Sequence, residues 1–406
     1  MKKLKISSIL SLFCLLPLAG HAQQVTLTVT NELPMQRQEV VEVAYDSILK
    51  RIPVGPYESV VVKNAFGQQI TYQLTHDRKL LFDVEILPHG KATFTVEKGI
   101  PQPMKAWVYG KTYPERVDDI TWENDRGIYR VYGPALQRTG ERAFGIDVWT
   151  KNTPELVVKD RYTTALDGTT RQKKLIKAGK KEQAEAIRVA TTFHLDQGNG
   201  MDCYNVGPTL GCGTPALMSQ GELVFPYCFK EYEILDNGPL RFTLALTYDT
   251  KKIGDNDQVT EHRIISLDKG SNYNKTTVWY DGLQKPMDMA AGIVVHSTDK
   301  KDMTLGKDYI LYVDPTDAPE KHNFQIYTGV LFPQSAQTTY LPKTNNDKGY
   351  EGHVVGIVRK LQNNARYTYY FGSAWSNYDV RTQAEWQLRS EEYMAGLKSP
   401  LKLTIR

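Results

Sequence analysis

The chain has 406 residues, of which 41% are hydrophobic, so it can bury a large core in one large domain or two moderate ones. Its formal charge of +4 includes Lys2, Lys3 and Lys5, and the remainder of the chain carries only +1. This near-neutral balance disfavours a nucleic-acid partner. No stretch beyond residue 22 reaches the roughly eighteen apolar residues of a membrane-spanning helix, so no integral membrane segment is expected in the mature chain.

Residues 1–22, MKKLKISSILSLFCLLPLAGHA, have the pattern of a secretory signal peptide. The stretch has a basic start, an apolar run and a small residue, Ala22, at its end. Cys14 would suggest a lipoprotein anchor, but the bulky Phe13 before it does not suit lipoprotein processing. We therefore predict a periplasmic or secreted protein without a lipid anchor.

Three cysteines follow the signal peptide: Cys203, Cys212 and Cys228. An odd number in an oxidising compartment leaves at least one thiol free. Cys203 and Cys212 are close enough in sequence for a local disulfide, but free buried thiols are the equal alternative. The chain has no CxxC or HExxH motif, so a zinc site has no support, and the pattern leaves any cofactor unknown.

Residues 23–102 are expected to form an N-terminal β-sandwich module. Short runs of alternating polar and apolar residues recur there, separated by turn residues. The runs are VTLTVTN, EVVEVAY, SVVVKN, QITYQLT, LLFDVE and ATFTVEK. The proline-bearing segment IPQPMK, residues 100–105, is the predicted boundary.

Residues 103–406 continue the strand pattern, which predicts a large, mostly antiparallel all-β domain. The expected strands are GIDVWT, LVVKDRY, RFTLALTY, TTVWYDG, AGIVVHS, DYILYVD, NFQIYTGVLF, GHVVGIVR and ARYTYYFGSAW. Two stretches differ. The lysine-rich residues 171–189 favour a solvated turn or short helix, and residues 380–399, rich in helix formers, predict a helix packed on one sheet.

Residues 120–137, ITWENDRGIYRVYGPALQ, combine four consecutive polar side chains with several aromatic ones. If Ile128–Tyr132 is a strand, Arg130 and Tyr132 share one face, and Glu123–Arg126 form the loop that enters it. Polar clusters at strand ends are typical of functional sites on β-scaffolds. The alternative is that ion pairs within the loop only hold it in place.

Residues 193–217, FHLDQGNGMDCYNVGPTLGCGTPAL, contain five glycines and two prolines around His194, Asp202 and Tyr204. Glycine permits unusual backbone angles and close approach, which predicts a contorted loop that presents polar groups. The spacing matches neither nucleotide-loop pattern, GxxxxGK[ST] or GxGxxG. A purely structural Ω-loop is the alternative.

The segments WENDRGIYRVYGP and GMDCYNVGPTLGCG, with GIDVW between them and YEILDNGPLR after them, resemble the exported family DUF4861 of polysaccharide-degrading Bacteroidetes. The resemblance spans most of the mature chain. It implies an antiparallel supersandwich similar to the galactose-mutarotase fold and a role in using polysaccharides that contain uronic acids. It carries over no catalytic residue.

For such a substrate, Arg126 is expected to bind the uronate carboxylate with two hydrogen bonds, while aromatic rings stack on the sugar. Neutralising the carboxylate acidifies the C5 proton, which a tyrosine or histidine could then remove. The substrate-binding candidates are Trp122, Asn124, Arg126, Tyr132, Trp149 and Trp375. The catalytic candidates are Glu123, Tyr129, His194, Asp202, Tyr204, His296 and His353.

The sequence therefore predicts a protein that acts on an acidic oligosaccharide or polysaccharide as a lyase or a glycoside hydrolase. A mutarotase-like isomerase and a non-catalytic glycan-binding protein remain the alternatives. Residues 123–126 are expected to form one wall of the groove, and Asp202 with Tyr204 another. Carboxylate pairs for hydrolysis, such as Glu123 with Asp147 or Asp202 with Glu261, cannot be chosen from sequence.

Overall fold

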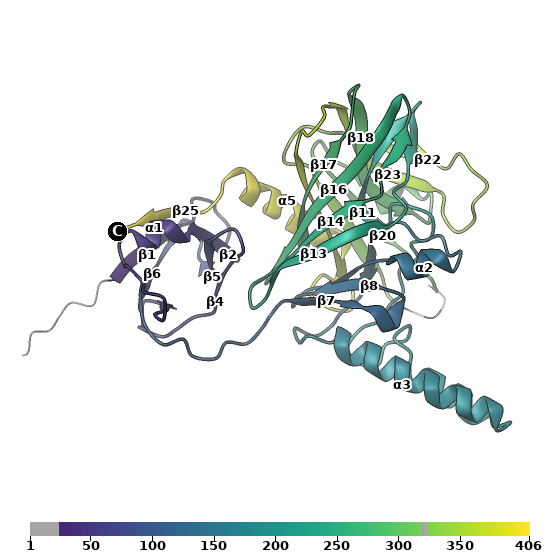
Figure 1. Cartoon of the computed structure of the whole chain (residues 1–406), viewed down its shortest axis with the longest axis horizontal. Helices are drawn as coiled ribbons and strands as arrows, with labels where there is room; N and C mark the ends of the chain where they lie inside the picture. The colour runs from purple at the N-terminus through teal and green to yellow at the C-terminus, as the bar shows by residue number, and fades with distance from the viewer. Residues whose placement is uncertain (1–23, 319–320, 322) are drawn as a thin grey trace, which may run out of the picture.

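The computed structural model describes residues 24–318, 321 and 323–406 (Figure 1), so the predicted signal peptide lies outside the described residues. Antiparallel strands dominate, and helices are few. The predicted all-β fold is confirmed. No helix within the described ranges is both long enough and apolar enough to span a membrane.

The N-terminal module consists of two small sheets packed on a shared apolar core. All six strands expected there are present, and a short helix, α1 (Tyr45–Leu49), follows the second. The strands are β1 (Gln24–Thr30), β2 (Arg37–Ala44), β3 (Val60–Lys63), β4 (Tyr72–Leu74), β5 (Lys79–Ile86) and β6 (Lys91–Lys98). In β1 the side chains alternate, so that Val25, Leu27 and Val29 are fully buried.

The last strand, β25 (Lys402–Ile405), pairs with β1 in the N-terminal module. Thr28 lies opposite Thr404, and the half-buried Leu403 and Ile405 pack against the module's core. From the sequence, residues 103–406 were expected to form one domain, and the pairing of the last strand with the N-terminal module was not anticipated. The boundary at residue 102 stays a prediction, with β25 as an addition to the first module.

Two large antiparallel sheets form the body of the molecule. The nine-stranded sheet contains β13 (Phe229–Asn237), β14 (Arg241–Tyr248), β15 (Lys251–Ile253), β16 (Asn256–Asp268), β17 (Tyr273–Asp281), β19 (Met303–Leu305), β20 (Tyr309–Asp314), β21 (Ile326–Leu331) and β24 (Tyr367–Trp375). The five-stranded sheet contains β11 (Cys212–Ser219), β12 (Glu222–Val224), β18 (Met287–Val295), β22 (Gln337–Pro342) and β23 (Gly352–Leu361). Their apolar faces share one core, as expected of a sandwich.

A four-stranded sheet lies against this sandwich and carries the polar stretch singled out from the sequence. Its strands are β7 (Tyr109–Tyr113), β8 (Asp119–Glu123), β9 (Ile128–Val131) and β10 (Asp147–Trp149). The short helix α2 (Pro134–Arg138) follows β9. Every residue of β8, β9 and β10 is buried, so polar side chains on these strands must find partners inside the protein.

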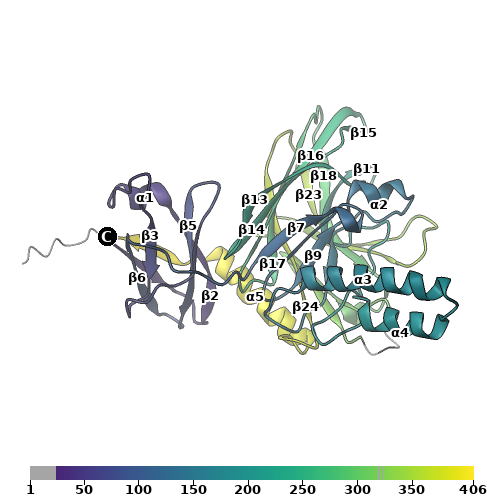
Figure 2. The ribbon, with the colours of Figure 1, turned by 60° about the horizontal axis from the view of Figure 1, so that its bottom comes forward.

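A helical hairpin projects from the body beside this sheet (Figure 2). It comprises α3 (Val158–Lys177) and α4 (Lys181–Thr191). The expectation of a strand at residues 156–162 is wrong, because the Glu123 carboxylate accepts hydrogen bonds from the backbone N–H groups of Val157 and Val158 and so caps a helix there. The turn or short helix expected at 171–189 is likewise replaced by parts of two full helices. The expected C-terminal helix is confirmed as α5 (Gln383–Lys398).

The pairing of β25 with β1 yields a stability prediction. Replacing both Leu403 and Ile405 by alanine removes apolar contacts with the N-terminal core, and we expect the free energy of unfolding to fall by about 2 to 4 kcal/mol. Urea denaturation measures the change. Thr404→Ala, on the exposed side of the same strand, is the matched control and should stay close to wild type. Equal effects of the two variants would contradict a packed strand.

Candidate functional site

The turn between β8 and β9 is held by Asn124. The Asn124 Oδ1 accepts hydrogen bonds from the backbone N–H groups of Arg126 at 2.8 Å and Gly127 at 3.0 Å. Its Nδ2 donates to the backbone oxygens of Asp268 and Ser271. Asn124 is fully buried, so the structure places it in a structural role and not at a sugar-binding surface.

Glu123 is also occupied within the protein. Its carboxylate lies 2.7 Å from the Lys151 Nζ and caps the start of α3. Lys151 is buried, and burial lowers the pKa of its ammonium group despite the neighbouring Glu123 charge. The pair therefore joins the β8–β9 turn to the helical hairpin and leaves Glu123 without access to a substrate.

Arg126 lies in a different part of the molecule from Asp202 and Tyr204. Its Nη1 donates to Asp379 at 2.5 Å, and Arg389 contacts the same carboxylate. Arg126 lines a cleft of about 570 Å³ beside the N-terminal module. The expected groove with residues 123–126 facing Asp202 and Tyr204 is therefore corrected, because these side chains turn toward structural partners.

Several aromatic candidates belong to the core. Trp122 is fully buried and stacks on Phe242 with ring centroids 5.9 Å apart. The Tyr129 hydroxyl donates to the Asn272 backbone oxygen at 2.8 Å. Trp375 is buried too, and its Nε1 donates to the Asn323 backbone oxygen at 3.0 Å. None of these three rings lines one of the clefts described here, so none presents a free face on which a sugar could stack.

Two of the histidine candidates are also enclosed. His353 accepts a hydrogen bond from the Leu210 backbone N–H, and burial lowers its pKa to about 3, so it stays neutral in the core. The His296 Nδ1 lies 2.6 Å from Asp314. Burial alone would lower the pKa of His296, but the Asp314 charge and hydrogen bond reverse this, and the pKa is raised. His296 packs behind Tyr204, with ring centroids 6.0 Å apart.

A second cleft, of about 460 Å³, brings together the remaining candidates. We call it the acidic cleft. Tyr132, His194, Asp202 and Tyr204 line it, and so do residues that the sequence did not single out: Arg116, Asp119, Arg142 and Asp317. The two stretches quoted from the sequence therefore do meet, through Arg130 and Tyr132 and not through Glu123–Arg126.

The glycine-rich loop reaches the cleft because it runs beside β10. The Thr150 backbone N–H donates to the Met201 oxygen at 2.8 Å. Gly200 has φ +98°, and a Cβ there would lie 2.3 Å from the Thr150 oxygen, so only glycine permits this approach. The next turn of the loop carries Asp202 into contact with the β-sheet.

Arg130 on β9 is the centre of a buried charge cluster. Its Nη2 lies 2.6 Å from the Asp147 Oδ2 and 3.1 Å from the Asp202 Oδ2, and its Nη1 lies 3.6 Å from Asp119. The guanidinium also packs over the rings of Tyr132 and Trp149. Trp149 is buried and stacks on Phe193, so it supports this cluster from below and offers no face to a sugar.

Three carboxyl groups around one guanidinium leave an excess of negative charge. Burial raises the pKa of Asp119 and of Asp202 to about 6 each, against the attraction of Arg130. Burial raises the pKa of Asp147 to about 7, and the nearby Asp202 adds to the rise. The cluster thus retains protons near neutral pH. Asp202 and Asp119 line the cleft, whereas Asp147 is fully buried behind them.

His194 stands at the mouth of the acidic cleft, with 58% of its side chain exposed. Its Nδ1 lies 3.2 Å from the Asp202 backbone oxygen, which orients the ring. Burial of the rest of the imidazole lowers its pKa, so the ring is neutral at pH 7. With a proton on Nδ1 donated to that carbonyl, Nε2 is left as an available base.

The two tyrosines of the cleft remain protonated, since burial raises the pKa of both well above the ordinary value. The Tyr132 hydroxyl accepts a hydrogen bond from Arg130 at 3.2 Å, which leaves its own proton to donate. The buried Tyr204 hydroxyl has no hydrogen-bond partner among the described residues. Both groups are therefore proton donors rather than bases.

Arg116 is the cation that sequence reasoning missed. It lies on a short turn (Pro114–Arg116) between β7 and β8, with its guanidinium over the rings of Tyr162 and Phe193. It makes no ion pair with any residue that the structure describes, and its buried Nε has no hydrogen-bond partner there. The available signal was RVDD, residues 116–119, directly before the quoted stretch.

Cys203, Cys212 and Cys228 are free thiols, so the local disulfide left open by the sequence does not form in this structure. Within the described part of the chain, no group of three or more His, Cys, Asp or Glu residues is arranged to hold a metal ion.

The raised carboxyl pKa values predict a pH dependence of stability. An unfolded aspartate titrates near pH 3.9, so between about pH 4 and 7 the folded cluster holds protons that the unfolded chain releases. The stability from these groups is complete below about pH 4 and is lost as the pH rises to about 7. Asp147→Asn should make this fall shallower.

Urea denaturation at a series of pH values measures this slope. Asp160→Asn, on the exposed surface of α3, is the control and should keep the wild-type slope. A slope unchanged by Asp147→Asn would show that the folded protein does not hold an extra proton at this position.

Comparisons with known proteins fit this architecture. The chain is 25% identical over 343 residues to "Uncharacterized protein P7" of Formosa agariphila, covering 80% of this chain and 78% of that protein. Its fold is similar to a protein in the glycosyl hydrolase family 38 from Enterococcus faecalis, with a TM-score of 0.50 and 6% identity. That match covers 95% of this chain but 47% of the other, so the chain corresponds to about half its length. An alpha-mannosidase from E. faecalis V583 gives a TM-score of 0.47 at 8% identity, with 95% of this chain and 46% of that one covered. The model of the Domain of unknown function (DUF4861) family matches residues 29–403, and the chain belongs to this family.

Proposed function

We propose that the acidic cleft binds a uronic-acid-containing oligosaccharide or polysaccharide and that the protein is a polysaccharide lyase. A carbohydrate substrate is supported by the fold shared with a protein in the glycosyl hydrolase family 38. The signal-like residues 1–22 support action in the periplasm or outside the cell. Recovery of the native protein from the cytosol with residues 1–22 intact would contradict that location.

The observation that carries the proposal is the meeting of three groups in one cleft. Arg116 is a guanidinium without a carboxylate partner in the described structure, His194 is a neutral base at the mouth, and Tyr132 is a protonated donor. β-Elimination from a uronate needs these same functions: a cation for the carboxylate, a base for the C5 proton and an acid for the leaving oxygen.

The reaction assigns each group one step. Arg116 binds the sugar carboxylate with charge-assisted hydrogen bonds and makes the C5 proton more acidic. The His194 Nε2 takes that proton, the released electron pair forms the C4–C5 double bond, and the bond from C4 to the glycosidic oxygen breaks. Tyr132 gives its proton to the departing oxygen. Arg130 orients the Tyr132 hydroxyl through a hydrogen bond, and its positive charge offsets the negative charge of Asp202.

Glycoside hydrolysis is the second candidate, because Asp202 and Asp119 both line the cleft with raised pKa values, as a general acid requires. Asp147 and Asp202 do not form an inverting pair. Their contacts of 2.6 and 3.1 Å with one nitrogen keep them closer than the roughly 6.5–9.5 Å such a pair uses.

The reaction type can be read from the products. Pectic, ulvan-like and glycosaminoglycan fragments should be incubated with the protein and separated by chromatography. The lyase predicts a product that absorbs in the ultraviolet because of its new double bond, and His194→Gln should abolish it. His89→Asn, an exposed residue of the N-terminal module, is the control. New reducing ends without absorbance would favour the hydrolase, and anomer exchange alone an isomerase. Binding without turnover would favour a glycan-binding protein.

The arginine assignment gives a second prediction. Arg116→Lys keeps the charge but loses the two-pronged geometry, so binding of the acidic sugar should weaken by about 1 to 3 kcal/mol. Arg126→Lys, which instead disturbs the contacts with Asp379, should lower the melting temperature and leave the affinity unchanged. Calorimetric titration and thermal melting of both variants measure these effects. If Arg126→Lys instead weakened binding of the acidic sugar and Arg116→Lys left the affinity unchanged, the carboxylate-binding role would belong to Arg126.

A further inference from the structure

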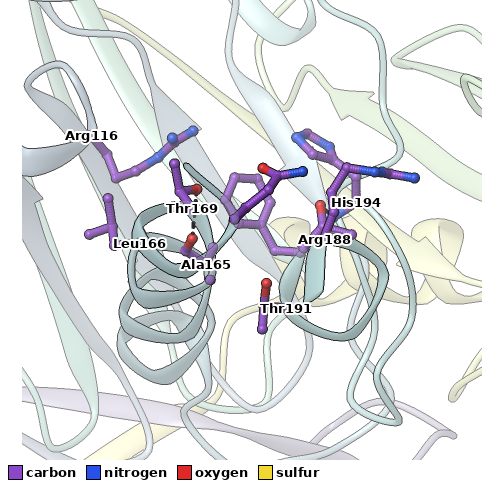
Figure 3. A pocket seen from close by; sticks show the side chains of 11 residues that line it. Arg116, Ala165, Leu166, Thr169, Arg188, Thr191 and His194 are labelled. Carbon is purple, nitrogen blue, oxygen red and sulfur yellow. Dashed lines mark hydrogen bonds between the residues drawn. The ribbon is translucent and has the colours of Figure 1, made fainter. Parts of the chain in front are cut away.

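A smaller groove of about 160 Å³ lies between α3 and α4 at their junction with the body (Figure 3). We call it the hairpin groove. Arg116 and His194 line it, and the same two residues line the acidic cleft. In Figure 3 they lie along one edge of the groove, above Thr169 and Thr191 on the two helices. The two hollows are therefore adjacent and share the residues assigned to the carboxylate and the proton.

The lining of the hairpin groove is part apolar and part polar. Phe193, Ala165 and Leu166 provide apolar surface, while Thr169, Gln172 and Arg188 provide hydrogen-bonding groups. A sugar presents the same mixture, with apolar CH faces and hydroxyl edges. The two helices α3 and α4 pack closely against each other below the groove, because a Cβ on Gly168 would lie 1.8 Å from the Thr191 Oγ1.

The hairpin also carries a strong excess of positive charge. Residues 158–192 contain nine lysines or arginines and four aspartates or glutamates, a surplus of five. Residues 23–406 together carry +1, so the rest of that span is negative by four charges. This basic element projects from the body (Figure 2). The adjacent acidic cleft is lined by several carboxylates. A long anionic ligand gains electrostatic attraction along the hairpin that a short one does not reach.

We propose that the hairpin groove is a second sugar subsite, which holds the residue next to the one in the acidic cleft, and that the rest of an acidic chain follows the basic surface of α3 and α4. This inference rests on the proposed function and extends it from one sugar to a chain. It makes Thr169, Gln172 and Arg188 determinants of preference for longer substrates. It also explains why Arg116 and His194 face both hollows.

The test compares acidic oligosaccharides of two and six residues prepared from pectin, ulvan and chondroitin sulfate. Binding is measured by calorimetric titration at low and at moderate salt. Hexamers should bind at least about tenfold more tightly than dimers, and the advantage should shrink as salt screens the hairpin charges. A single-stranded DNA hexamer serves as an anionic control and should bind more weakly than the best sugar hexamer.

Thr169→Trp tests the groove itself, because the indole would fill it from the exposed surface of α3. It should reduce the affinity of dimers and of hexamers about tenfold each, because either length places its second sugar in the groove. Thr170→Trp is the matched control, since Thr170 is the next residue, is equally exposed, and its hydroxyl likewise donates to the backbone oxygen four residues earlier. It should bind both lengths as wild type does. Thermal melting verifies that each variant is folded.

The outcomes separate the two proposals. A Thr169→Trp variant that binds both lengths as tightly as Thr170→Trp does would overturn the second subsite. Dimers and hexamers of equal affinity would overturn the path along α3 and α4. Either result leaves the lyase assignment in place. DNA that binds as tightly as the sugar hexamer would reduce the hairpin to a non-selective basic surface and would also overturn it. Failure of every acidic sugar to bind would overturn the proposed function together with this extension.

Discussion

The contact on which the candidate site depends is the one between Arg130 and its three carboxyl groups. Asp119 is at the start of β8, Asp147 is at the start of β10, and Asp202 comes from the glycine-rich loop, so one side chain joins three segments that are distant in sequence. Inside a protein an unpaired charge costs several kcal/mol. Arg130 offsets part of that cost for all three at once. Burial still disfavours the charged carboxylates, and it raises their pKa values against the attraction of Arg130.

A second buried contact determines which element lies beside the cleft. The Glu123 carboxylate accepts hydrogen bonds from Lys151 and from the backbone N–H groups at the start of α3, and these bonds connect the β8–β9 turn to the helical hairpin. Because the hairpin borders the cleft, the direction in which α3 leaves the sheet determines the shape of the hairpin groove. Residues 123–126, which the sequence suggested as one wall of a binding groove, thus hold the elements beside the candidate site in place.

The fold was largely predictable from the sequence, since alternation of polar and apolar residues marks strands without any knowledge of their partners. The same logic failed at residues 156–162, where Val157 and Val158 suggested a strand and a distant carboxylate instead started a helix. For the candidate site, the sequence singled out His194, Asp202, Tyr204 and Tyr132, which share the acidic cleft, because unusual residues gather near glycines and strand ends. Glu123, Arg126 and Trp149 do not line this cleft, and Arg116 lines it without having been singled out, because sequence does not reveal whether a charge or a ring already has a partner.

The pairing of β25 with β1 has a consequence for the order in which the protein assembles. A ribosome synthesises β1 near the beginning of the chain and β25 only after both large sheets and α5. The first sheet therefore waits with one edge of β1 open while the larger domain is made, although its neighbour β6 is already available. An unpaired strand edge is the part of a β-protein that most readily joins another chain. β1 is thus the first strand to be made, yet one of its edges has no partner until the last strand, β25, is available.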